Sequence, residues 1–113
     1  MGRTTPPLPL PVKRALRKLG ADIRDARKRR GIPLDLLAQR ALTSHVTMMK
    51  VERGHPSVSI GVYANALFAV GLVERLGAVA DRANDEVGQA LEHERLPKRV
   101  RVSSRARKSS RDE

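Results

Sequence analysis

The stretch LAQRALTSHVTMMKVERG, residues 37–54, has the pattern of two short helices joined by a very short turn. Thr43 and Ser44 interrupt the first helix. Ser44 is a good N-cap for the second, because a serine hydroxyl accepts a hydrogen bond from a free amide of the first helical turn. Gly54 then supplies a left-handed stop. The stretch therefore predicts a helix, a turn of about three residues and a second helix.

The side chains of this stretch divide between an inner and an outer face. Met48 and Val51 are three residues apart on a helix, so we expect them to face inward with Leu37 and Ala41. Ala38 is small at the point where the two helices would cross closely. The remaining side chains of the second helix are expected to face outward: Ser44, His45, Val46, Thr47, Met49 and Lys50.

Length and composition favour one small all-α domain. The chain has 113 residues and only two aromatic side chains, Tyr63 and Phe68, so burial depends on aliphatic side chains and methionine, which suits packed helices. We expect a compact five-helix domain over residues 12–94, between a disordered proline-rich segment at 1–11 and a flexible basic tail at 95–113. The chain has no cysteine, which excludes disulfides and cysteine nucleophiles.

The other helices are expected from apolar spacing and capping residues. Residues 12–30 have the pattern of an amphipathic helix, which Gly20 can divide and Gly31 ends. Ser59 can cap a helix whose inward face is Ile60, Tyr63, Ala64 and Leu67. A fifth helix over 72–81 carries the apolar side chains Leu72, Val73, Leu76 and Val79. A short last helix can follow, with Asn84 as its cap.

The net charge of +11 is distributed unevenly. Residues 1–30 carry a net +8 and 95–113 a net +6, whereas 31–71 carry +1 and 72–94 carry −4. A basic chain attracts polyanions because each phosphate that Lys or Arg neutralises releases condensed counterions. Nucleic acid is the leading partner, and basic tails that only keep the domain soluble are the alternative. No stretch is apolar enough to span a bilayer and no secretory signal is present, so we expect a cytoplasmic protein.

The same stretch resembles the Cro/C1-type (XRE) helix-turn-helix family over roughly residues 19–80. The matching residues are Leu37, Ala38, Arg40, Ala41, Ser44, Met48, Val51, Glu52 and Gly54. The chain departs from the family at Leu42, which is often glycine there, and at Thr43, which is often a buried valine or isoleucine. Leu34 stands where the family often has a glutamine that contacts phosphate. The resemblance implies a homodimer that binds double-stranded operator DNA.

The outward side chains of the second helix are suited to the major groove. Lys50 can donate to guanine, His45 can donate or accept, and Val46 can pack on a thymine methyl group. Ser44 and Thr47 are better suited to phosphate. We expect the DNA-binding residues to be Ser44, His45, Val46, Thr47, Met49, Lys50 and Arg53. Simple exposure to solvent is the alternative for His45 and Met49.

Residues 67–101 resemble the C-terminal part of short XRE proteins that act as HipB-like antitoxins. The resemblance implies a protein that represses its own operon and holds a HipA-family serine/threonine kinase toxin inactive. The acidic segment 72–94 is consistent with a protein partner. We expect a homodimer or partner contact at the four apolar residues Leu72, Val73, Leu76 and Val79, which could instead only close the monomer core.

Two other functions stay open on the sequence alone. One is a stand-alone XRE-type repressor without a toxin partner, and the other is a small basic RNA-binding protein. An enzyme is the least expected class, because the chain shows no carboxylate pair, nucleophile and base set or phosphate loop. The three histidines have no partner at metal-ligand spacing, so no metal or cofactor is expected.

Overall fold

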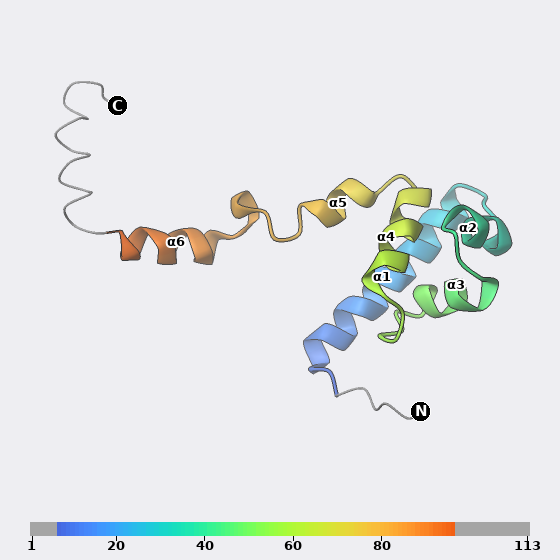
Figure 1. Ribbon diagram of the computed structural model, residues 1–113, viewed down its shortest axis with the longest axis horizontal. Helices are drawn as coiled ribbons and strands as arrows, with labels where there is room; N and C mark the ends of the chain where they lie inside the picture. Colours follow the sequence, from blue (N-terminus) through green and yellow to red (C-terminus); the bar gives the residue numbers. More distant parts are fainter. Residues whose placement is uncertain (1–6, 97–113) are drawn as a thin grey trace, which may run out of the picture. The chain divides into compact units, whose positions relative to one another are not determined.

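The computed structural model describes residues 7–96, which form six α-helices and one short 3-10 helix with no strand (Figure 1). The predicted all-α class is therefore confirmed for this part of the chain. The elements are α1 (Leu10–Arg29), α2 (Leu34–Arg40), α3 (His45–Glu52), α4 (Ile60–Ala69), α5 (Val73–Gly77), η1 (Arg82–Asn84) and α6 (Glu86–Arg95). Nearly all of the expected basic tail at 95–113, and most of the expected disordered segment at 1–11, lie outside the described residues.

The contacts of the chain separate it into two units, with the boundary after Gly77. The first unit contains α1 to α5, and the second begins at Ala78 and contains η1 and α6. The single domain that we expected over 12–94 is thus divided. The reason is burial: from Ala78 to Leu96 no side chain is buried, so this segment adds nothing to the hydrophobic core.

The first helix begins earlier than predicted. α1 starts at Leu10 rather than at Val12, with Pro9 at the N-cap and Pro11 inside the first turn. Proline is tolerated there because the first amides of a helix have no partner within the helix. Leu10 and Pro11, which we expected to be disordered, are therefore helical. Pro33 likewise precedes α2 as its N-cap.

Gly20 does not divide α1, which is continuous from Leu10 to Arg29. Its face is instead covered by the end of α3. A Cβ atom at position 20 would lie 2.4 Å from the carbonyl oxygen of Val51 and 2.5 Å from the amide nitrogen of Gly54. In the other direction, a Cβ atom at position 54 would lie 2.2 Å from the carbonyl oxygen of Leu16. The two glycines allow α1 and the end of α3 to meet backbone to backbone.

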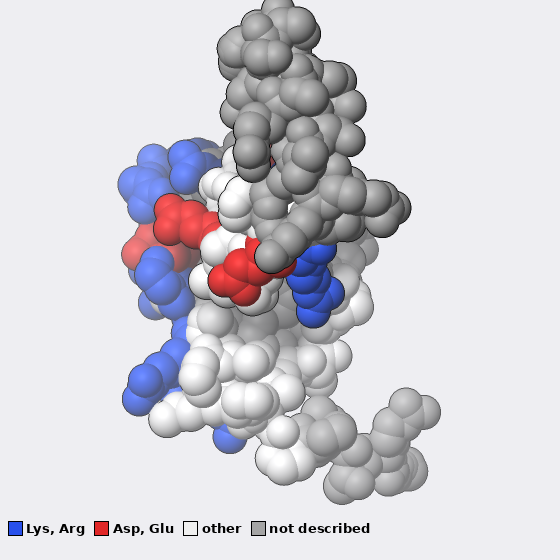
Figure 2. Space-filling model, turned by 90° about the vertical axis from the view of Figure 1, so that its left-hand side faces the viewer, with Lys and Arg blue, Asp and Glu red and all other residues white. Residues whose placement is uncertain are grey.

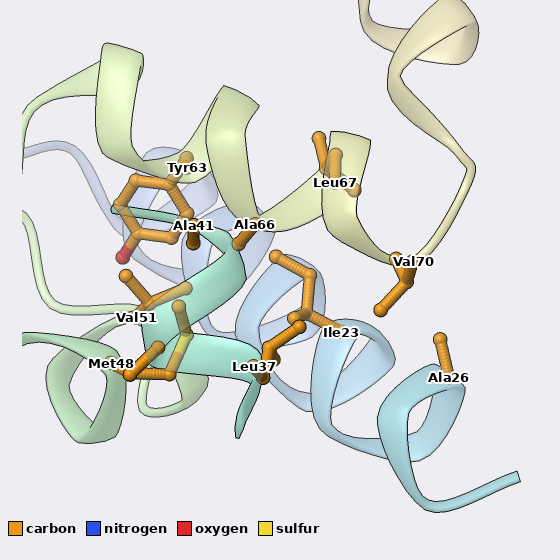
Figure 3. Close-up of a cluster of buried hydrophobic side chains, with 11 residues drawn as sticks. Ile23, Ala26, Leu37, Ala41, Met48, Val51, Tyr63, Ala66, Leu67 and Val70 are labelled. Atoms are coloured by element: carbon orange, nitrogen blue, oxygen red, sulfur yellow. The ribbon is translucent and has the colours of Figure 1, made fainter. Parts of the chain in front are cut away.

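The predicted inner face of the helix-turn-helix stretch is confirmed. Figure 3 shows Met48, Val51 and Leu37 pointing toward one another in the core, and all three are fully buried. Ala38 and Ala41 are buried with them. The other members of the core cluster come from α1 and from the α4 segment: Ile23, Ala26, Tyr63, Ala66, Leu67 and Val70. The core is thus formed by α1 to α4.

The prediction for α4 was partly wrong. Ser59 caps the helix as expected, with its hydroxyl accepting from the Val62 amide at 3.3 Å. Ile60, however, is 72% exposed, because the buried face begins one turn later at Tyr63. The Tyr63 hydroxyl donates to the His55 carbonyl oxygen at 2.8 Å and fastens the loop between α3 and α4. Burial raises the pKa of this hydroxyl.

The segments after α4 also differ from the prediction. α5 ends at Gly77 rather than near residue 81. The cap of α6 is Asp85, whose carboxylate accepts from the Gly88 amide at 3.0 Å, and not Asn84. The Asn84 side chain instead donates to the Ala78 carbonyl oxygen at 2.9 Å. Both residues are good caps, and the sequence alone did not distinguish them.

Four helices end in the same hydrogen-bonded motif, in which two amides beyond the cap return to carbonyls of the last turn. The residue after the cap is left-handed each time: Gly31, Gly54, Gly71 and Leu42. After α2, the Leu42 amide donates to Gln39 and the Thr43 amide donates to Ala38. Leu42 is the only non-glycine residue with positive φ, at 58°, in the described part of the chain.

We expect Gly20→Ala to lower the free energy of unfolding by about 3 kcal/mol, because the added methyl group meets backbone atoms that cannot rotate away. Gly77→Ala is the control. A Cβ atom at position 77 meets nothing within 4 Å, so the free energy of unfolding should stay constant or rise by up to about 1 kcal/mol. Urea unfolding followed by circular dichroism measures both. Equal effects of the two substitutions would contradict the close crossing.

Leu42→Gly is expected to raise the free energy of unfolding by about 1 kcal/mol, because glycine removes the penalty of a side chain in the left-handed conformation. Little packing is lost, since Leu42 is 85% exposed. Leu42→Ala removes the same exposed side chain and keeps the penalty, so it should not stabilise the protein. Thermal melting of both variants and of the unmodified protein measures these differences in stability. An alanine variant as stable as the glycine variant would refute the explanation.

Candidate nucleic-acid interface

α2 and α3 lie beside each other, joined by residues 41–44 (Figure 1). The Ser44 hydroxyl accepts from the Thr47 amide at 3.1 Å, which confirms the predicted cap. Gly54 ends the helix with φ 71°, also as predicted. The turn is held from outside by Asn65 of α4, whose side-chain amide donates to the Ala41 carbonyl oxygen at 3.2 Å. The orientation of α3 is therefore fixed at both of its ends.

The predicted outward residues of α3 are not all equally accessible. Ser44, His45, Lys50 and Arg53 are exposed, and Val46 is 61% exposed despite being aliphatic. Thr47 and Met49 are partly buried. The accessible surface of α3 thus combines a large apolar side chain with a lysine and polar groups, the mixture that direct contact with base edges requires.

Ser44 makes a second hydrogen bond within the predicted cap. Its oxygen accepts from the Thr47 amide, and its hydroxyl donates to the Thr47 hydroxyl oxygen at 3.0 Å. The Ser44 proton is therefore engaged within the cap. The Thr47 hydroxyl keeps its own proton, and of the two it is the better placed to donate to a phosphate.

A side-chain contact at the start of α3 was not predicted. Nδ1 of His45 contacts Oδ1 of Asp35, which stands in the first turn of α2. The carboxylate holds one ring nitrogen, so Nε2 is the nitrogen left to contact a ligand. The only sequence signal was an acidic residue in a first turn, which is explained equally well by the helix dipole.

Met49 lies on the side of α3 that faces α1. It lines a hollow of about 330 Å³ together with Leu34 of α2, three arginines and Glu52. The arginines are Arg24, Arg27 and Arg53. Met49 is thus neither in the core cluster nor on the fully exposed face of α3, and its contact with DNA stays a prediction.

A bidentate ion pair joins α1 to the last residue of α3. Arg27 donates through Nε to Oε2 of Glu52 at 2.7 Å and through Nη2 to Oε1 at 3.1 Å. It also donates through Nη1 to the carbonyl oxygen of Ile32 at 3.0 Å. The two side chains are only 12% and 8% exposed. A shielded pair with parallel hydrogen bonds fixes both position and angle, so it holds the end of α3 against α1.

The three comparisons give no family assignment. No family model matches the chain, and neither the curated proteins nor the solved structures provide a significant match. The resemblance to the Cro/C1-type family therefore depends on the matched residues themselves.

No helix in residues 7–96 is long and apolar enough to cross a bilayer. No group of three or more acidic or histidine side chains in that part of the chain could hold a metal ion.

The four residues expected at a dimer or partner interface fall into two groups. Leu72, Val73 and Leu76 are partly buried against the core cluster, which is the packing role that the sequence also allowed. Val79 is 72% exposed and follows the end of α5. A homodimer contact at these residues stays a prediction.

We expect Glu52→Gln to lower the free energy of unfolding by about 2–3 kcal/mol, because it leaves the shielded Arg27 guanidinium without a countercharge. Asp22→Asn is the control. This substitution removes the partner of Lys18 in an exposed ion pair within α1, whose Nζ and Oδ2 atoms are 2.6 Å apart. It should change the free energy of unfolding by less than about 0.5 kcal/mol. Chemical unfolding at pH 7 measures both, and a loss for Glu52→Gln as small as the control would contradict the role of the pair.

Proposed function

We propose that the protein binds double-stranded operator DNA in a sequence-specific manner through the outward face of α3. The observation that carries the proposal is the division of this eight-residue helix. Met48 and Val51 are buried, whereas Val46 and Lys50 are exposed on a helix fixed by its cap and by an ion pair. A helix held rigidly with its first turns exposed fits the major groove, whose base pairs present distinct patterns of donors, acceptors and methyl groups.

Each exposed side chain has a chemical role in this proposal. Lys50 donates to guanine O6 and N7, and Val46 packs on a thymine methyl group. His45 contacts a base edge through Nε2, since its Nδ1 faces Asp35. Thr47 and Arg53 contact phosphate, which positions the helix without reading sequence. The basic composition of the chain supports a phosphate-bearing ligand.

A narrower proposal is that the protein acts as an antitoxin: it represses its own operon as a homodimer and neutralises a HipA-like kinase. Its support is the resemblance of residues 67–101 to HipB-like antitoxins, together with the surface of α6. That helix exposes the apolar side chains of Val87 and Leu91 beside acidic residues, a surface better suited to a protein than to DNA. A stand-alone repressor without a kinase partner is the alternative.

Footprinting on the DNA upstream of the gene, followed by binding measurements, tests the DNA-binding proposal. We expect Lys50→Ala to weaken operator binding by about 1–3 kcal/mol, that is, about five- to 150-fold, and to relax base preference, with little change on a random duplex. Lys28→Ala removes another exposed lysine, at the end of α1, and serves as the control. If Lys50→Ala weakened binding to operator and random DNA equally, its role in reading sequence would be refuted.

The antitoxin proposal is tested with a HipA-family kinase encoded beside this gene. We expect the two purified proteins to form a complex in which the kinase's phosphorylation activity is suppressed. The complex should give a longer footprint over the same operator than this protein alone. Specific operator binding with no kinase complex would instead support the stand-alone repressor.

A further inference from the structure

A second feature of the structure adjoins the outward face of α3, shares Arg53 with it, and consists of cationic side chains of α1. The hollow lined by Met49 also contains Arg24 and Arg53. A second hollow, of about 250 Å³, is lined by Lys13, Arg17 and His55. Arg53 lines both hollows. We call the two hollows together the α1–α3 groove, defined by Lys13, Arg17, Arg24 and Arg53.

Helical spacing places these cations on one side of α1. Lys13, Arg17 and Arg24 are four and seven residues apart, and Gly20 falls between them on the same face. Gly20 is the residue at which α1 touches the end of α3. Lys13 and Arg17 therefore precede the contact with α3 along the helix, Arg24 follows it, and Arg53 lines the hollows next to all three.

The positive charge of this groove is not neutralised by the protein. Among residues 7–96, the side chains of Lys13, Arg17, Arg24 and Arg53 make no hydrogen bond and no ion pair. The only acidic residue lining either hollow is Glu52, and it is already engaged by Arg27. Four cations thus surround hollows without a free carboxylate. Figure 2 shows Lys and Arg side chains (blue) along the left edge of the face in view, with Asp and Glu side chains (red) among them near its upper end.

One of these cations stands where a helix disfavours it. Lys13 lies at the end of the first turn of α1, and this turn contains no acidic residue. The helix dipole is positive at this end, so a cation there opposes helix formation. Residues that break a local rule without a compensating contact in the fold are often explained by a ligand.

We propose that the α1–α3 groove binds the phosphodiester backbone of duplex DNA, as a contact that adds affinity without reading sequence. The proposal rests on the proposed function, because it supplies a second contact to the same ligand. From Lys13 to Arg24 the helix advances about 16 Å, and one strand of B-DNA carries a phosphate about every 3.4 Å of helix axis. A row of cations of this length fits a polyanion better than a single small anion.

The test compares two double variants of α1 that change the net charge equally. Lys13→Gln with Arg17→Gln removes two cations from the groove, and Arg14→Gln with Lys18→Gln removes two from another face of the same segment. All four residues are exposed, and glutamine has a helix propensity close to that of lysine and arginine, so both variants should fold. Circular dichroism and thermal melting verify this before binding is measured.

The measured quantity is the slope of log K against log salt concentration, on operator and on random duplex. We expect the slope of the groove variant to become shallower by about 1.8 on both duplexes, because two phosphate contacts are lost. The slope of the control variant should change by less than half as much. The ratio of operator to random affinity should remain constant in the groove variant.

The outcomes separate this proposal from the proposed function. If the unmodified protein showed no operator preference, the proposed function would fail, but the slopes on random duplex would still decide the groove. If operator preference held and both variants changed the slope equally, net charge alone would act and the groove proposal would be overturned. Displacement of DNA by poly-glutamate as readily as by a duplex of equal charge would overturn it as well, by favouring an acidic protein as the ligand.

Discussion

The contact on which the rest of the structure depends is the backbone-to-backbone crossing of α1 with the end of α3. Gly20 and Gly54 leave no side chain between the two segments, and carbonyl and amide groups lie where a Cβ atom would be. A crossing this close determines which other residues meet. It allows Arg27, seven residues after Gly20 on α1, to reach Glu52 on α3. It also brings the basic face of α1 beside Arg53.

A helix of eight residues has little stability of its own, because nucleation is unfavourable and few hydrogen bonds follow it. α3 is therefore stable only through its surroundings. Ser44 satisfies its first turn, Gly54 ends its last, and Met48 and Val51 anchor it in the core. Because these groups occupy its ends and its inner face, the outer face contributes little to folding and is free to be selected for binding.

The sequence predicted features whose causes are local. The caps Ser44 and Ser59, the glycine stops and the buried pair Met48 and Val51 follow from the chemistry of neighbouring residues. The sequence did not predict features that depend on residues far apart in the chain. Gly20 looked like a helix break because only the position of α3 shows that it is a packing glycine. The Arg27–Glu52 pair joins residues 25 apart, which no local pattern could have matched.

The division of charge between α3 and α1 has a consequence for how such a protein would bind. α3 contains a single cation, Lys50, whereas α1 contains eight basic and two acidic residues. Contacts to base edges specify sequence, while phosphate contacts supply affinity that depends on salt. If α3 made both kinds of contact, added cations would raise its affinity for every DNA sequence and weaken its preference for one of them. In the proposed mode of binding, placing the charge on α1 would leave α3 free to discriminate through shape, one lysine and the Val46 methyl groups.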